Sequence, residues 1–273
     1  MIDEAEIRRR ALAALRGLAV GDAMGAAAEG YQPAEIEEVY EAPIAELLDP
    51  VNLYPESAPD RVRGAIGPVT ESALAIIPFL ESDGRPNPPP VEVSWAVALG
   101  IVTPVASLDH VVAAIPQNEA KAVVAAIVAA VSAGVGGYLA RDALALANRA
   151  TDLAGDPALG QRILQAAGEA QASGGRRVGA FIGADFPPTP GPADAVVFAL
   201  GVVFGTQSVR RAIPEAVNQG GRASLAAGLA GAITGALVPT STVESWADEV
   251  EGASGLHLTA VAERLLAIRR RAG

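Results

Sequence analysis

Apolar residues recur along the chain at the spacing of an amphipathic helix. Within residues 3–24, Ala11, Leu15 and Leu18 follow one another at intervals of four and three, behind acidic residues suited to a helix start. Similar patterns cover residues 93–106, 108–115, 119–133, 140–154, 157–172 and a final segment ending at the arginines 269–271. The sequence shows no convincing two-residue alternation of the kind typical of a strand. We therefore predict an all-α fold.

One stretch, residues 216–239, is nearly uncharged and rich in small residues, with the sequence AVNQGGRASLAAGLAGAITGALVP. Gly220 and Gly221 permit a left-handed turn at its start. The later glycines would each cost up to about 1 kcal/mol in an exposed helix, a loss that close packing would offset. We predict a loop that leads into a central helix over 222–237, nearly encased by the other helices.

The segment between these strong patterns is less regular. Residues 31–67 contain scattered prolines and acidic residues, which indicates a loop-rich cover with a short helix around 33–48. Thr70 and Ser72 then precede the apolar run ALAIIPFL. This order predicts a helix start, with one of these two hydroxyls as the N-cap.

Charge and composition narrow the classes of partner. The 273 residues carry a net charge of −11, which disfavours binding to nucleic acid or to anionic lipid through a basic face. The two Arg-Arg-Arg runs, at 8–10 and 269–271, are short and fit the exposed faces of terminal helices. The chain has no cysteine, so it has neither disulfides nor thiolate sites. No composition shift marks a boundary, and we predict one domain over 1–273.

A long apolar run between Lys121 and Arg141 raises the question of a membrane span. It consists mostly of Ala, Val and Gly and lacks an aromatic belt, so we interpret it as a buried helix. The first residues, MIDEAEIRRR, contain no apolar core of a secretory signal. We expect a cytoplasmic protein that does not enter a membrane.

Three motifs, taken in order, resemble the ADP-ribosylglycohydrolase family. They are GLAVGDAMGAAAEG at 17–30, GPVTESALAI at 67–76 and the stretch 216–237 with its Asn-x-Gly-Gly turn. The resemblance implies a compact helical fold that cleaves an N- or O-glycosidic bond of ADP-ribose. It also implies two magnesium ions held by acidic residues of the second and third motifs, with a glutamate of the first motif as acid or base.

Carried over position by position, the resemblance is incomplete at the metal ligands. This chain keeps Asp22, Glu29 and Thr70, and has Glu71 at the first acidic position of the second motif. Ser72, Arg222 and Ser224 stand at the other three acidic positions, and Ala73 and Leu225 replace threonines. Because hard dications need several oxygen ligands, one carboxylate out of four is too few. We predict no metal and no cofactor.

These positions define the predicted site. Glu29 and Glu71 are the candidate catalytic residues, and the candidate ligand-binding residues are Asp22, Thr70, Ser72, Asn218, Gly220, Gly221, Arg222 and Ser224. For Glu29 the alternative is a carboxylate that accepts N–H groups at a helix end. For Arg222 we expect a guanidinium that pairs with Glu71 in the volume of a magnesium ion. A solvent-facing arginine, or one that holds a ligand anion, is the alternative.

Two weaker features also stand out. Asp109-His110 suggests a general base, although an ordinary surface histidine is the simpler interpretation. Gly174-Gly175-Arg176-Arg177 suggests a phosphate-binding loop, and a helix C-cap is the simpler interpretation there.

Three functions remain open. The first is a protein that binds ADP-ribose, a nucleotide or another small polar ligand without classical turnover. The second is a metal-independent hydrolase or lyase acting on a small or nucleoside-like substrate through Glu29 or Glu71. The third is a structural partner within a complex. The sequence names neither the ligand nor the oligomeric state.

Overall fold

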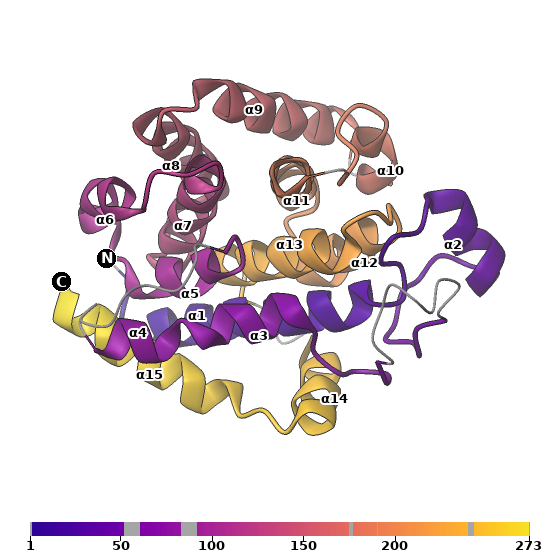
Figure 1. The fold of residues 1–273 in the computed structure, drawn as a ribbon, viewed down its shortest axis with the longest axis horizontal. Helices are drawn as coiled ribbons and strands as arrows, with labels where there is room; N and C mark the ends of the chain where they lie inside the picture. Colours follow the sequence, from indigo (N-terminus) through magenta and orange to yellow (C-terminus); the bar gives the residue numbers. More distant parts are fainter. Residues whose placement is uncertain are drawn as a thin grey trace.

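The computed structural model describes residues 2–51, 61–82, 92–174, 177–189, 191–239 and 243–272, and within these ranges it contains helices and no strand (Figure 1). The helices are α1 (Glu4–Gly25), α2 (Pro33–Tyr40), α3 (Pro68–Ala75), α4 (Ile77–Glu81), α5 (Trp95–Val102), α6 (Leu108–Ala114), α7 (Lys121–Val135), α8 (Ala140–Ala154), α9 (Pro157–Ala172), α10 (Val178–Gly183), α11 (Pro192–Thr206), α12 (Val209–Val217), α13 (Ala223–Leu237), α14 (Glu244–Ser254) and α15 (Leu258–Ala272). The predicted all-α class is confirmed.

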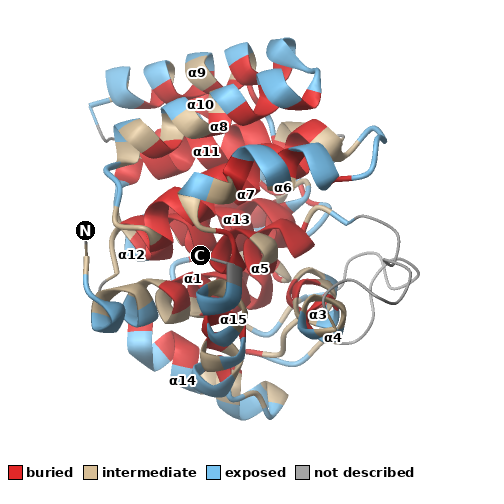
Figure 2. Ribbon diagram, turned by 90° about the vertical axis from the view of Figure 1, so that its left-hand side faces the viewer, coloured by how far each residue is buried: buried red, intermediate tan, exposed pale blue. Residues whose placement is uncertain are grey.

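The centre of the molecule is α13. All of its residues are buried, and α1, α7, α11 and α12 pack around it. Figure 2 shows these inner helices as the buried part, while α9 and α14 lie on opposite outer sides. The prediction of an encased helix over 222–237 is confirmed, with Arg222 as the N-cap residue.

The closest packing in the core is between α1 and α13, where glycines let the two backbones touch. A Cβ atom on Gly17 would lie 2.1 Å from the carbonyl oxygen of Gly231, and one on Gly21 would lie 2.2 Å from that of Ala227. Gly25 meets Ser224 in the same way, at 2.5 Å from its Cα. From the side of α13, a Cβ on Gly231 would lie 2.2 Å from the carbonyl oxygen of Gly17, and one on Gly235 would lie 2.3 Å from that of Ala13. Glycines that would weaken either helix in isolation therefore allow this contact.

The order of these contacts makes the two helices antiparallel. Gly17 faces the middle of α13, whereas Gly25, at the end of α1, faces the first turn of α13. The segment that follows α1 is thus held beside the N-terminus of α13. The first and third sequence motifs meet there.

Arginines from the two terminal clusters close the ends of buried helices. Arg10 donates through Nη1 to three carbonyl oxygens at the C-terminal ends of α7 and α13, at 2.9–3.2 Å. Arg269 donates in the same way at the end of α5, at 2.7–2.8 Å. Unsatisfied carbonyls and the negative end of the helix dipole favour such cations. The prediction that these clusters only decorate exposed faces is wrong for Arg10 and Arg269.

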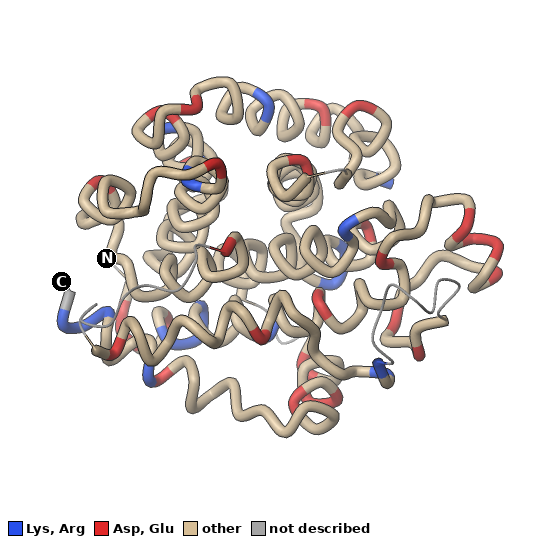
Figure 3. The backbone as a smooth tube through the Cα atoms, viewed as in Figure 1, with Lys and Arg blue, Asp and Glu red and all other residues tan. Residues whose placement is uncertain are grey.

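The central helix α13 carries no charged residue, whereas the helices around it and the loops do (Figure 3). The apolar run after Lys121 forms α7, which is buried along almost its whole length. Within the described residues, no single helix has both the length and the apolarity needed to cross a membrane.

The α1–α13 contact gives a stability prediction. Gly21→Ala places a methyl group against the backbone of Ala227, and overpacking of this kind costs about 1–3 kcal/mol or more. The control is Gly168→Ala in the exposed part of α9, where the new Cβ meets nothing within 4 Å. It should stabilise the protein by about 0.4–1 kcal/mol. Urea unfolding measures both, and equal stabilities for the two variants would contradict the packing.

Candidate functional site

Asp22 lies in the last turn of α1 and is 0 % exposed. Its Oδ2 accepts hydrogen bonds from the backbone N–H groups of Gly67 at 2.8 Å and Thr70 at 2.9 Å. The donors belong to the N-cap residue and the first turn of α3, so Asp22 caps a helix whose N-cap residue lies 45 positions later in the sequence. The prediction that Thr70 or Ser72 is the N-cap is wrong, because Gly67 holds that position and a remote carboxylate supplies the acceptor.

Glu29 does the same for α13. Its Oε2 accepts the backbone N–H of Ser224 at 2.7 Å, in the first turn of that helix. The alternative given for Glu29, a carboxylate at a helix end, is therefore the arrangement that the structure contains. The Ser224 hydroxyl donates to the carbonyl of Asp22 at 3.3 Å, which joins the two caps.

The Gly220-Gly221 turn lies against the segment after α1. Gly221 donates to the carbonyl of Tyr31 at 2.8 Å, and Gly30 donates to the carbonyl of Gly221 at 2.7 Å. Both glycines of the turn have positive φ, 63° and 59°. A Cβ on Gly220 would lie 1.8 Å from the Tyr31 carbonyl oxygen. This close backbone approach explains why glycine occupies the position.

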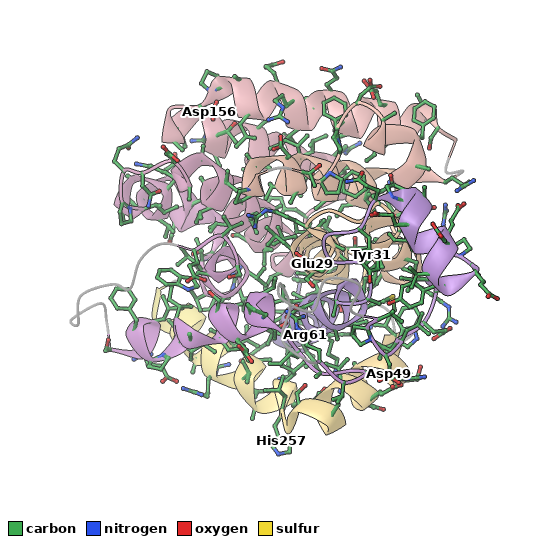
Figure 4. The ribbon with its side chains drawn as sticks, turned by 45° about the vertical axis from the view of Figure 1, so that its right-hand side comes forward. Glu29, Tyr31, Asp49, Arg61, Asp156 and His257 are labelled. Atoms are coloured by element: carbon green, nitrogen blue, oxygen red, sulfur yellow. The ribbon has the colours of Figure 1, made fainter. Side chains whose placement is uncertain are left out.

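The cation at this site is Arg61, which sequence reasoning missed. Its Nη1 lies 3.5 Å from Oδ1 of Asp22, and its side chain is 16 % exposed. The guanidinium fills the space beside Gly67, where a Cβ would come within 2.1 Å of it. Figure 4 places Glu29, Tyr31 and Arg61 in the same central region. Arg61 belongs to no motif or periodic pattern, so only the fold brings it here.

The electrostatics of the two carboxylates are set mainly by lost hydration. Burial raises the pKa of Asp22, while the N–H groups of Thr70 and Gly67 and the Arg61 charge oppose that rise. Loss of hydration around the Glu29 carboxylate likewise raises the pKa of Glu29, and the hydrogen bond from the backbone N–H of Ser224 opposes that rise. Glu29 nevertheless keeps an exposed surface, and this access to water limits the shift.

The remaining predicted residues are more dispersed. Glu71 is exposed in the first turn of α3, and the Ser72 hydroxyl bonds to the carboxylate of Glu92. Arg222 is exposed, and among the described residues no ion pair joins it to Glu71. The hydroxyl of Thr70 is buried beside Asp22 and favours the charged form of that carboxylate. Its distance and angle to the described residues do not complete a hydrogen bond.

Asn218 lies away from the two carboxylates. Its side-chain amide bonds the backbone of Ile44 in both directions at 2.8 Å and donates to the carbonyl of Pro214 at 2.8 Å. It thus holds the segment after α2 against α12. The first of the two weaker features, Asp109-His110, lies on the surface, where Asp109 pairs with Arg149.

A metal centre requires several ligating side chains close together. Within the described residues, no three His, Asp or Glu side chains come close enough together to hold an ion. The Asp22 carboxylate is already bonded to two N–H groups and faces a guanidinium. The residues present therefore do not fit the pair of magnesium ions that the resemblance implies.

Comparison with known proteins decides the family. The family model described as ADP-ribosylglycohydrolase matches residues 3–102 and 98–273. This chain belongs to the ADP-ribosylglycohydrolase family. A solved structure described as "ADP-ribosylglycohydrolase-related protein complex" has a TM-score of 0.52 and 19 % identity, over 98 % of this chain and 100 % of that one. At this identity the likeness establishes the fold alone. The search of curated proteins returned no match.

The role of Asp22 as a remote cap gives a second prediction. Asp22→Ala leaves two N–H groups of α3 without an acceptor and a largely buried guanidinium without its partner, which should cost about 2–5 kcal/mol. The matched control is Asp3→Ala, which removes the exposed cap of α1 and should cost about 1 kcal/mol. Denaturant unfolding compares the two, and equal losses would contradict the buried cap.

The raised pKa of Glu29 gives a third prediction. A carboxyl whose pKa is higher in the fold than its ordinary value of 4.5 binds more protons folded than unfolded. Its contribution to stability is thus largest below 4.5 and declines as pH rises through the folded pKa. The stability of the wild type relative to Glu29→Gln should fall over that window. A difference that grows with pH would contradict the shift.

Proposed function

We propose that this chain is a ligand-binding member of the family that has lost the dinuclear magnesium site and lacks classical glycohydrolase turnover. Its ligand would be ADP-ribose, a nucleotide or another small polar molecule. The observation that carries the proposal is the position of Arg61, whose guanidinium lies against Asp22 and is close enough to Glu29 to lower its pKa. A protein cation thus stands beside Asp22, whose carbonyl oxygen accepts a hydrogen bond from Ser224, one of the positions at which the resemblance implies a metal ligand.

The charge balance supports this proposal. In the family pattern, magnesium ions offset the repulsion among several acidic side chains. Here Ser72, Arg222 and Ser224 replace three of the acids, and Arg61 offsets Asp22 directly. A dication entering this site would meet a guanidinium and too few carboxylates to replace its water ligands. Without that Lewis acid, several kcal/mol of transition-state stabilisation are lost.

The hydrogen bonds by which Asp22 and Glu29 cap two helices also support the proposed loss of turnover. Asp22 and Glu29 are needed to cap α3 and α13 whether or not the protein is a catalyst. Their presence is therefore explained by the fold and is no argument for turnover. The exposed Glu29 carboxylate can accept hydrogen bonds from sugar hydroxyls, and Arg61 has donors suited to phosphate. A ribose phosphate offers both groups.

A second candidate function is a metal-independent hydrolase or lyase. The observation that favours it is the raised pKa of Glu29 together with its access to solvent, since such a carboxyl can serve as a general acid. Glu71, in the exposed first turn of α3, would be the second carboxyl. In either case we propose a small-molecule partner and a cytoplasmic location, with no role for nucleic acid or membrane.

A thermal-shift and turnover screen separates the candidates. The purified chain is tested with ADP-ribose, NAD, nucleosides and an ADP-ribosylated peptide, each with and without magnesium. A thermal shift without turnover, independent of magnesium, is the result we expect. Turnover without metal favours the second candidate. Turnover that requires magnesium would overturn both.

Arg61 provides the fourth prediction. Arg61→Gln should reduce affinity for the ligand found in that screen by about tenfold or more, because it removes a charge-assisted contact worth about 1.5–3 kcal/mol. The matched control is Arg63→Gln, whose guanidinium is exposed and bonds Glu249 at the surface. The control should bind as the wild type does. Equal affinity for wild type and Arg61→Gln would remove Arg61 from the site.

A further inference from the structure

The backbone of residues 61–67, which brings Arg61 to the candidate site, forms neither a helix nor a strand. Among the described residues, one backbone hydrogen bond lies within it, from the N–H of Ala65 to the carbonyl of Val62 at 3.0 Å. A single turn of this kind does not fix where the segment lies on the protein. Its position therefore depends on contacts with other elements, and these contacts decide where the Arg61 guanidinium lies.

Two N–H groups at the end of this segment donate to side chains from distant parts of the chain. Ile66 donates to the hydroxyl oxygen of Ser254 at 3.0 Å, and Gly67 donates to Oδ2 of Asp22 at 2.8 Å. Ser254 lies in α14 and Asp22 in α1, 188 and 45 positions away from their donors. Asp22 is also the partner of Arg61, so Ser254 is the anchor that does not belong to that ion pair.

A third anchor, nearer the start of the segment, is exposed. The N–H of Arg63 donates to Oδ1 of Asp49 at 2.9 Å, and the Arg63 guanidinium bonds the carboxylate of Glu249 at the surface. Exposed contacts of this kind contribute little, because water competes for the same groups. The bond to Ser254 is partly buried, so water competes less for it.

The helix that carries Ser254, α14, is itself fixed to α1. Oε1 of Glu251 accepts a hydrogen bond from Nε of Arg16 at 3.1 Å, in an ion pair whose two side chains are largely buried. Ser254 follows Glu251 by three residues, which places both on one side of α14. The hydroxyl that holds the segment is therefore placed relative to α1, the helix to which Asp22 belongs.

A shift of the segment would reach the guanidinium directly. The Arg61 guanidinium lies beside Gly67, the residue after Ile66, so movement at Ile66 also moves the surface on which the guanidinium rests. Its Nη1 lies 3.5 Å from Oδ1 of Asp22, which is at the outer limit of a hydrogen bond. A contact at that distance is lost after a small displacement.

We propose that Ser254 is a positioning residue, which holds the backbone at Ile66 so that the Arg61 guanidinium stays against Asp22. The effect of Ser254 on a ligand passes through Arg61. For this consequence the inference rests on the proposed function, which assigns the ligand to Arg61. The positioning itself is a property of the protein without ligand, so it is measured without one.

Chemical modification of arginine tests the positioning in the full chain. Phenylglyoxal is applied to the wild type, Ser254→Val and Ser254→Thr, and mass spectrometry of peptides gives the rate of modification at each arginine. The two substitutions introduce side chains of the same shape and branching, but threonine alone keeps the hydroxyl acceptor. Arg10 is the internal reference, because its side chain is 15 % exposed, against 16 % for Arg61.

Arg61 should react about fivefold faster in Ser254→Val than in the wild type, whereas Ser254→Thr should react as the wild type does. The rate at Arg10 should be the same in all three proteins. Equal rates at Arg61 in the three proteins would overturn the inference, as would a fast rate in Ser254→Thr. An equal rise at Arg10 would also overturn it, because it would report opening of the whole fold.

Calorimetry with ADP-ribose separates the inference from the proposed function. Ser254→Val should weaken ADP-ribose binding about fivefold, and it should have no further effect in the Arg61→Gln background. A further loss in that background would overturn the inference, because Ser254 would then act by another route. If Arg61 reacts faster in Ser254→Val but the wild type and Arg61→Gln bind ADP-ribose equally, the positioning stands and the proposed role of Arg61 in binding fails.

Discussion

Direct backbone contact between α1 and α13 is the constraint on which the rest of the structure depends. Glycines at successive turns of α1 allow the two helices to approach until carbonyl oxygens meet Cα atoms. The same contact brings the end of α1 to the start of α13. The hydrogen bonds of Asp22 and Glu29 are made near that point, because the chain leaving α1 runs beside the first turn of α13 and the start of α3.

The carboxylates of Asp22 and Glu29 have both a structural and an electrostatic role. Asp22 and Glu29 each satisfy N–H groups of a helix that begins far away in the sequence, and they join the three sequence motifs at one place. Burying these carboxylates costs free energy because they lose hydration, and the same loss raises the pKa of both groups. Arg61 offsets part of this cost at Asp22. The result is a cluster in which backbone N–H groups and one guanidinium compensate for two carboxylates.

The fold could be predicted from the sequence because its signals are local. The helical spacing of apolar residues, the acidic residues at the start of α1 and the composition of 222–237 each correspond to an observed element. The family resemblance also placed Asp22, Glu29 and Ser224 in one predicted site, and hydrogen bonds join these three residues in the structure. These inferences needed only periodicity and motif order.

The details of the site could not be predicted, because they depend on tertiary contacts. The residue type of Thr70 predicts an N-cap, yet Gly67 occupies the N-cap position of α3 and Asp22 supplies the hydrogen-bond acceptor. Arg222 stands where the pattern has an acid, and it was the expected cation. The guanidinium beside Asp22 instead comes from Arg61, in a segment with no regular pattern. Partners so far apart in the sequence leave no local pattern from which their contact could be predicted.

The central claim is that a guanidinium takes the place of metal at this site. It is tested most directly by a crystal structure of the protein soaked in manganese and ADP-ribose, with anomalous scattering recorded. We expect no anomalous peak at the site, with the Arg61 guanidinium beside Asp22. Two anomalous peaks near Asp22 and Glu71, with Arg61 displaced from the carboxylate, would contradict the account.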